Sequence, residues 1–168
     1  MVTESEQKAP NLARIEAATL EDLPQLVGML MDLFEMEGDF EPNYAKQEQG
    51  LRLILEQPNR GRIFVLRNDN TLMGMVNVLF TISTAEGGLV LVLEDFFVHP
   101  AHRGHGFGTR LLNAVLDFAR DKDFKRITLL TDKISEESQR FFTRHGFGHS
   151  TMIPMRMRLQ ADEHGETE

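Results

Sequence analysis

The stretch LVLVLEDFFVHPAHRGHGFGTRLL, residues 89–112, decides the fold. Its first part, Leu89–Val98, is almost continuously apolar and rich in β-branched and aromatic residues, which is typical of a strand buried on both faces. Pro100 ends this strand, and three glycines then alternate with other residues up to Gly108. From Thr109 onward the apolar residues recur at helical spacing. The stretch therefore predicts a strand, a glycine-rich turn and a helix, in that order.

The glycine-rich turn predicts a site for a phosphate or diphosphate. Glycine permits a positive φ and a close approach to the backbone, so successive N–H groups can converge at a helix N-terminus. A P-loop would need a lysine in the turn, and a dinucleotide-binding fingerprint would need Gly-x-Gly-x-x-Gly. The turn from Arg103 to Gly108 has neither pattern and reads Arg-x-x-Gly-x-Gly.

This turn, which follows a strand and Val-x-Pro, resembles the acetyl-CoA-binding signature of the GCN5-related N-acetyltransferase (GNAT) family. Two further segments support the resemblance. Residues 93–98, LEDFFV, are similar to the matching stretch of the spermidine/spermine acetyltransferase branch. Residues 138–147, SQRFFTRHGF, resemble a later family segment that usually reads Ala-x-x-Phe-Tyr-x-x-x-Gly-Phe.

Length and composition exclude several classes of protein. The 168 residues suit one domain, and the absence of cysteine excludes disulfides, thiol nucleophiles and cysteine-ligated metals. The first residues lack the apolar core of a signal peptide, and no apolar run is long enough to cross a bilayer, so a soluble, cytoplasmic protein without a membrane partner is predicted. A net charge of −8 argues against nucleic-acid binding.

The predicted fold class is α+β, with a central mixed and mostly antiparallel sheet and helices on both faces. The predicted domain covers residues 11–159, between disordered polar tails at 1–10 and 160–168. Strands are predicted at Asn11–Ala18, Arg60–Arg67, Thr71–Ile82, Leu89–Val98 and Arg126–Thr131, with a final hairpin at Phe147–Leu159. Helices are predicted from Thr19, over Asn43–Glu56, over Thr109–Lys122 and over Ser135–Arg144.

The resemblance implies an acetyl-CoA site with no metal. Backbone groups of Phe96, Phe97 and Val98 would pair with the pantetheine arm, as a further strand would. Amides of the turn would hold the diphosphate, and the Arg103 side chain would support either the turn or the charge of the cofactor. The residues of this predicted site are Phe96, Phe97, Val98, Arg103, Gly104, His105, Gly106, Phe107, Gly108, Thr109, Ser135 and Ser138.

The implied reaction needs a base, because a primary amine with a pKa near ~10 is mostly protonated at pH 7. Glu94 is the predicted base, acting directly or through a water, and Asp95 is the second candidate. Strand alternation places these two side chains on opposite faces, so one of them is expected to line the site. The other interpretation is that both acids mark a bulge or make structural hydrogen bonds.

The chain departs from the family at Phe142, where many members have a tyrosine proposed to protonate the leaving thiolate. A thiol pKa near ~8.5 makes coenzyme A a fairly good leaving group, so water or the departing ammonium could supply the proton. Tyr44, the only tyrosine, is a weaker substitute. Ser135 likewise stands where the family often has an asparagine that touches pantetheine.

His99, His102 and His105 invite a metal interpretation, but Pro100 and the glycines rule out helical ligand spacing and no acidic ligand lies beside them. No metal site is therefore predicted.

The predicted function is acetyl transfer from acetyl-CoA to a primary amine by direct attack in a ternary complex, because no cysteine can form an acyl-enzyme. The acceptor is expected to be a small amine, polyamine or amino-acid-like compound, with a protein amine as the alternative. A catalytically silent acyl-CoA sensor and an interaction domain that has lost the cofactor are the rival functions. The family often dimerises, so the resemblance allows a homodimer.

Overall fold

The computed structural model describes residues 13–38, 40–131 and 135–160. Contacts divide the chain into two units, Met1–Leu130 and Thr131–Glu168. Among the described residues, the first unit holds a five-stranded sheet and the helices α1–α3, and the second holds α4 (Glu136–Arg144). The predicted N-terminal tail, and all but the first residue of the predicted C-terminal tail, lie outside the described residues.

The sheet has the strand order β1-β2-β3-β4-β5. All neighbouring strands are antiparallel except β4 and β5, which are parallel. This confirms the predicted mixed, mostly antiparallel sheet. The strands are β1 (Arg14–Ala17), β2 (Gly61–Asn68), β3 (Thr71–Ser83), β4 (Gly88–Val98) and β5 (Ile127–Leu129).

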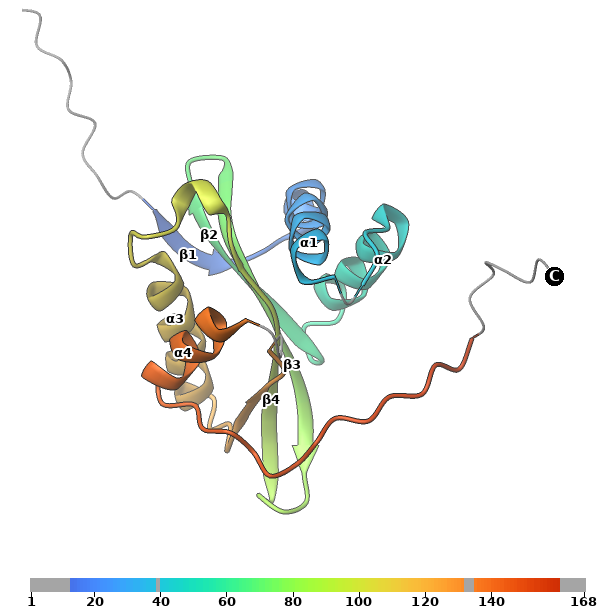
Figure 1. The fold of residues 1–168 in the computed structure, drawn as a ribbon, viewed down its shortest axis with the longest axis vertical. Coiled ribbons are helices and arrows are strands. Elements are labelled where there is room, and N and C mark those ends of the chain that lie inside the picture. Colours follow the sequence, from blue (N-terminus) through green and yellow to red (C-terminus); the bar gives the residue numbers. More distant parts are fainter. Residues whose placement is uncertain (1–12, 39, 132–134, 161–168) are drawn as a thin grey trace, which may run out of the picture. The chain divides into compact units, whose positions relative to one another are not determined.

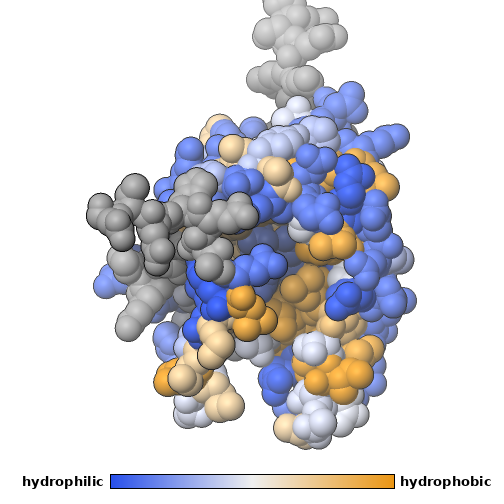
Figure 2. Space-filling view, turned by 90° about the vertical axis from the view of Figure 1, so that its right-hand side faces the viewer, coloured by the Kyte–Doolittle hydropathy of each residue, from blue (hydrophilic) through white to orange (hydrophobic). Residues whose placement is uncertain are grey.

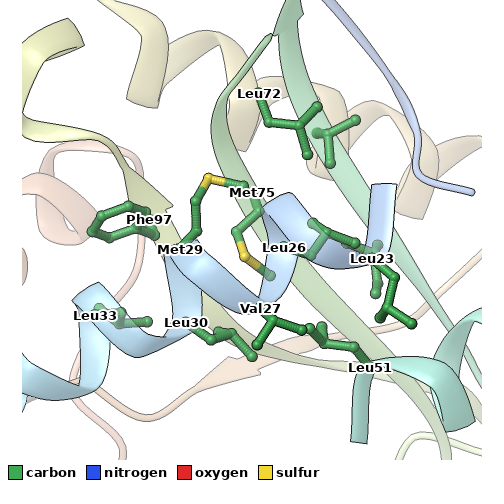
Figure 3. Packing of buried hydrophobic residues seen from close by; sticks show 12 residues of the cluster. Leu23, Leu26, Val27, Met29, Leu30, Leu33, Leu51, Leu72, Met75 and Phe97 are labelled. Atoms are coloured by element: carbon green, nitrogen blue, oxygen red, sulfur yellow. The ribbon is translucent and has the colours of Figure 1, made fainter. Parts of the chain in front are cut away.

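Helices cover both faces of this sheet (Figure 1). α1 (Leu23–Glu37) and α2 (Tyr44–Leu55) lie on one face, and α3 (Phe107–Asp121) lies on the other. Apolar side chains of α1 meet the sheet in one buried cluster, which includes Met75 of β3 and Phe97 of β4 (Figure 3). This packing fixes the C-terminal half of β4, from which the predicted catalytic acids project.

Local sequence explains where these helices begin and end. The backbone N–H of Thr19 donates to the Asp22 carboxylate at 2.9 Å, and a proline follows at the start of α1. Gly38 ends α1 with a φ of 70°, as a left-handed helix cap requires. At the start of α2, the Asn43 side chain accepts a hydrogen bond from the Lys46 N–H, which confirms Asn43 as the boundary of the second helix.

A buried ion pair joins α1 to the sheet. Both guanidinium NH₂ groups of Arg67 donate to the Asp22 carboxylate at 2.8 Å, and its Nε donates to Glu16 at 2.6 Å. Burial opposes ionisation of Asp22, but the hydrogen bonds from Arg67 and Thr19 hold the pKa of this carboxyl below its ordinary value.

Replacing Arg67 with alanine is expected to destabilise the fold by about 3 kcal/mol at pH 7, because it leaves Asp22 as an uncompensated buried charge. A carboxyl with a lowered folded pKa stabilises the fold above its unfolded pKa of 3.8 and loses that contribution as pH falls below it. Urea unfolding at pH 7 and pH 3 should therefore show a smaller difference between wild type and variant at pH 3. An equal difference at both pH values would contradict the assignment.

The final hairpin predicted at Phe147–Leu159 is wrong: this segment of the structure contains no strand. The predicted strand Arg126–Thr131 is also shorter, at Ile127–Leu129. After α4 the chain continues without regular secondary structure, and its large apolar side chains from Met152 to Leu159 are exposed. Hydrophobic residues are visible among hydrophilic ones on the molecular surface in Figure 2.

Candidate active site

A β-bulge in β4 shapes the first part of the site. Met75 of β3 faces Phe97, but Asn77, two residues further along β3, faces Glu94, so β4 holds one extra residue between these pairs. Asp95 lies in this bulge with a φ of 52°, which is unusual for a residue other than glycine. The close approach of the strands there requires Gly74, because a Cβ on it would come within 2.9 Å of the Phe97 carbonyl oxygen.

The bulge brings the Asp95 carboxylate to Asn77. The Asn77 Nδ2 donates to Asp95 Oδ2 at 2.6 Å. Burial raises the pKa of Asp95 to about 6; the Asn77 hydrogen bond opposes the rise, and the charge of Glu94 adds to it. A carboxylate with this pKa is ionised at neutral pH and can still accept a proton, as a general base must.

Asn77 is a site residue that sequence reasoning missed. It is 2% exposed, and its Oδ1 is the only buried side-chain nitrogen or oxygen atom of the described residues without a hydrogen-bond partner. Asn77 lies on the same side of the sheet as its neighbour Ile63, a member of the cluster under α1. The available signal was a single amide within the apolar run LMGMVNVLF, since a buried polar side chain needs a partner.

Glu94 occupies a different environment from Asp95. Its side chain is exposed, and it is the direct cross-strand partner of Asn77. The sequence predicted that Glu94 and Asp95 lie on opposite faces of the sheet, because side chains alternate along a regular strand. The bulge breaks this alternation, since Asp95 binds Asn77, which is also the cross-strand partner of Glu94. Asn77 is therefore the hydrogen-bond partner of Asp95 and the cross-strand partner of Glu94.

The pairing of β4 with β5 ends before the bulge. β5 pairs with β4 only over Leu91–Leu93, whereas β3 pairs with β4 as far as Val98. The carbonyl of Val98 accepts a hydrogen bond from Arg103 Nε at 2.9 Å. The C-terminal half of β4 thus lies beyond the end of its pairing with β5, as the predicted pantetheine contact requires.

The glycine-rich turn has the backbone conformation that the sequence predicted. Gly104 and Gly106 have φ angles of 83° and 76°, and Gly106 is the N-cap of α3. The first N–H groups of a helix have no carbonyl one turn earlier, so they point out of its N-terminus, where the helix dipole favours an anion. A Cβ built on either glycine meets no atom within 4 Å, and the first turn of α3 has no acidic residue. These features fit the diphosphate of acetyl-CoA.

Two arginines near the turn make contacts within the protein. Arg103 bonds to Val98, and its guanidinium lies 5.8 Å from the centre of the Phe97 ring. These contacts correspond to the first of its two predicted roles, support of the turn. Arg110 donates to the Ala13 carbonyl at 2.6 Å and so connects α3 to the start of β1.

In the second unit, Ser135 and Ser138 form the N-terminal cap of α4. The Ser135 hydroxyl oxygen accepts from the Ser138 N–H at 3.3 Å and lies 3.0 Å from the Ser138 hydroxyl. Phe142 is buried and stacks edge-on with Phe147. The side chain at the position of the family's tyrosine is thus a packing group of its own unit.

The described residues contain no group of three or more His, Asp or Glu side chains arranged to hold a metal. None of the described helices combines the length and the apolar character needed to cross a membrane. Tyr44, the alternative acid, is the first residue of α2 and is half exposed.

Comparison with known proteins identifies relatives of the chain. The family model described as acetyltransferase (GNAT) family matches residues 24–147. An uncharacterized N-acetyltransferase of Bacillus subtilis (strain 168), YhfO, is 27% identical over 110 residues, which cover 64% of this chain and 74% of the relative.

Two solved structures share the fold. A predicted acetyltransferase with acetyl-CoA from Clostridium acetobutylicum matches with a TM-score of 0.73 and 18% identity, covering 91% of this chain and 100% of that one. An aminoglycoside acetyltransferase from an uncultured soil metagenomic sample, in complex with sisomicin, matches with a TM-score of 0.72 and 21% identity, covering 88% and 97%.

Proposed function

The chain belongs to the acetyltransferase (GNAT) family, and from this membership we propose that it moves an acetyl group from acetyl-CoA to a primary amine by direct attack in a ternary complex. The observation that carries the proposal is the partly buried carboxylate of Asp95, held by Asn77 where β4 extends beyond its pairing with β5. A base at this position would lie directly before residues 96–98 of β4, the backbone that would align a thioester.

The cofactor side of the site uses mostly backbone groups. Acetyl-CoA supplies a thioester whose acetyl carbon is open to attack by nitrogen. The amides of residues 104–109 bind its diphosphate, and the backbone of residues 96–98 pairs with its pantetheine arm. Ser135 and Ser138 stay candidates for pantetheine contacts. A chain with a net charge of −8 repels this anion at long range, so the affinity comes from these local N–H groups and the helix dipole.

We assign the base to Asp95, with Glu94 as the alternative. Asp95 takes the proton of the amine, the nitrogen forms a bond to the acetyl carbon, and the carbon–sulfur bond breaks to release coenzyme A thiolate. Phe142 has no proton to give, so the sulfur is reprotonated by water or by the proton that the attacking nitrogen loses as the amide forms. Asn77 holds Asp95 through a hydrogen bond from Nδ2.

The acceptor is a small molecule with a primary amine in this proposal. The aminoglycoside acetyltransferase with sisomicin supports a small-molecule amine, and two carboxylates beside Asn77 favour a cationic one. A panel of polyamines, amino acids, aminoglycosides and a lysine-containing peptide, assayed by release of coenzyme A thiol, tests this. Turnover of the peptide alone would move the proposal to a protein amine. Binding of acetyl-CoA without turnover of any acceptor would support the sensor and contradict the proposal.

The pH dependence of kcat should identify the base. With Asp95 as the base, kcat should fall below about pH 6, because the protonated carboxyl cannot take a proton. Replacing Asn77 with leucine should move this fall in kcat to higher pH, because the Asn77 hydrogen bond lowers the pKa of Asp95. Replacing Glu94 with glutamine should move the fall in kcat to lower pH, because the charge of Glu94 raises the pKa of Asp95.

Stopped assays from pH 5 to pH 9 at saturating acetyl-CoA would measure these shifts. If the fall in kcat at acidic pH disappeared in Glu94→Gln and stayed at the same pH in Asn77→Leu, the base would be Glu94 and not Asp95.

A further inference from the structure

The side-chain amide of Asn77 has two polar ends, and only one of them has a partner. Nδ2 donates to Asp95 Oδ2 at 2.6 Å, whereas Oδ1 is buried and has no hydrogen-bond partner among the described residues. A buried polar atom that makes no hydrogen bond lowers the stability of the fold, because water binds the same atom in the unfolded chain. The unpaired oxygen therefore indicates that Asn77 serves a purpose other than packing.

The surroundings of Asn77 supply no donor for Oδ1. Ile63 faces Asn77 across the neighbouring strand, and Met75, two residues earlier in β3, points to the same face of the sheet. Both belong to the buried cluster under α1, whose members are all apolar (Figure 3). A water there would find too few polar partners to be held. The polar group that can meet Oδ1 is therefore the one that Asn77 already contacts, the carboxyl of Asp95.

The carboxyl of Asp95 needs a different end of this amide in each of its protonation states. Among the described residues, Asn77 is its only hydrogen-bond partner. The ionised carboxylate is an acceptor and needs the N–H of Nδ2, whereas the protonated carboxyl carries an O–H that only Oδ1 can accept. Because burial raises the pKa of Asp95 to about 6, both states are populated close to neutral pH.

The two ends of the amide can exchange places without repacking the core. The oxygen and the amino group are nearly alike in size, and the last torsion of an asparagine side chain has roughly two-fold preferences. Half a turn about the Cβ–Cγ bond of Asn77 brings Oδ1 to the Asp95 carboxyl and puts Nδ2 where Oδ1 was. One end of the amide is unpaired in either orientation, so the protonation state of Asp95 decides between them.

We propose that the Asn77 amide makes this half turn each time Asp95 takes up a proton, donating to the ionised carboxylate through Nδ2 and accepting from the protonated carboxyl through Oδ1. The proton that Asp95 takes from the amine is then shared with Asn77 until it leaves to water, and the amide turns back. Asn77 is thus a positioning residue that holds the base in both states. This inference rests on the proposed function for the source of the proton, but the turn itself follows pH in the chain alone.

Glu94 is the charged neighbour that acts on this pair, and it raises the pKa of Asp95. β3 has no ionisable side chain, the side chains with which α1 meets the sheet are apolar, and α3 lies on the other face. The acidic residues of α1 are exposed, and they are Asp32, Glu35 and Glu37. Hydrogen bonds to an ionised group are the stronger ones, so Asn77 still lowers the pKa of Asp95 although it binds both states.

NMR of the full chain without ligands tests the half turn. At pH 8 the Nδ2 protons of Asn77 should show nuclear Overhauser contacts with the β-protons of Asp95, and at pH 5 these contacts should be lost. The carboxyl carbon shift of Asp95, followed in the same samples, should titrate with the same midpoint. Asn43 is the matched control, because its Oδ1 accepts from the backbone N–H of Lys46, which does not titrate, so its contacts should stay constant.

The variant Glu94→Gln should move both midpoints to lower pH together. If the contacts persisted at pH 5 while Asp95 titrated, the amide would be a fixed donor with the proton on the far oxygen of Asp95, and the proposal would be overturned. An Asp95 that stayed ionised down to pH 5 would overturn it together with the assignment of the base. The measurements need neither acetyl-CoA nor an acceptor, so they decide the half turn even if no amine is acetylated.

Discussion

Replacing Gly106 with valine should weaken binding of acetyl-CoA by about 100-fold or more while the chain stays folded. Gly106 has a φ of 76°, and a β-branched residue rarely adopts such a conformation. The strain of about 1–3 kcal/mol favours another conformation of the turn, in which its amides no longer converge. A Cβ at this position meets no atom of the protein within 4 Å, so the substitution should leave the core undisturbed.

Calorimetric titration with coenzyme A measures this loss, and thermal unfolding verifies the fold. Gly87→Val is the matched control, because Gly87 lies in the β3–β4 turn with a φ of 70°, and a Cβ on it would likewise meet no atom within 4 Å. The control should carry the same backbone strain and keep its affinity. If Gly106→Val bound coenzyme A as wild type does, the turn would have no part in binding the cofactor.

The sequence predicted most of the first unit because its signals are local. Capping residues, glycines and apolar periodicity are read within a few residues, and they located α2 and the strand-to-helix turn to within two residues of their observed ends. The first helix was predicted from Thr19, but the chain there forms a short 3₁₀ turn, Leu20–Asp22, and α1 begins at Leu23. The hairpin predicted at Phe147–Leu159 failed for a different reason. Alternation indicates that a segment can form a strand, but it does not say which edge of a sheet that strand would join.

The site was predictable in its composition but not in its geometry. The glycine-rich turn and the two acids of β4 follow from the residue types. A bulge was one of two interpretations of these acids, and the sequence could not choose between them, because the bulge depends on the register of β3 against β4, which no single strand encodes. For the same reason no partner for Asn77 could be predicted, and Glu94 ranked above Asp95 as the expected base.

Replacing Asp95 with asparagine should lower kcat by about 10²–10⁴-fold, because an amide cannot take the proton of the amine. The same change should stabilise the fold by about 1–3 kcal/mol at pH 7. Burial raises the pKa of Asp95 to about 6, so the folded chain binds this proton more tightly than the unfolded chain does. The contribution of Asp95 to stability is therefore highest below pH 3.8, falls as pH rises through 6, and stays lower at neutral pH, where asparagine carries no charge to bury.

If Asp95 is a catalytic base that lowers the stability of the fold, Asp95→Asn should lower kcat and raise the free energy of unfolding. Steady-state assays give kcat, and urea unfolding at pH 7 gives the free energy of unfolding. Asp69→Asn is the matched control, because Asp69 also has a positive φ, 51°, but lies exposed in the β2–β3 turn, and it should change neither quantity. If Asp95→Asn raised stability and kept kcat, Asp95 would be a buried acid without a role in proton transfer. If it lowered kcat without raising stability, the carboxylate would serve the reaction from a solvated position, and the burial argument for its pKa would fail.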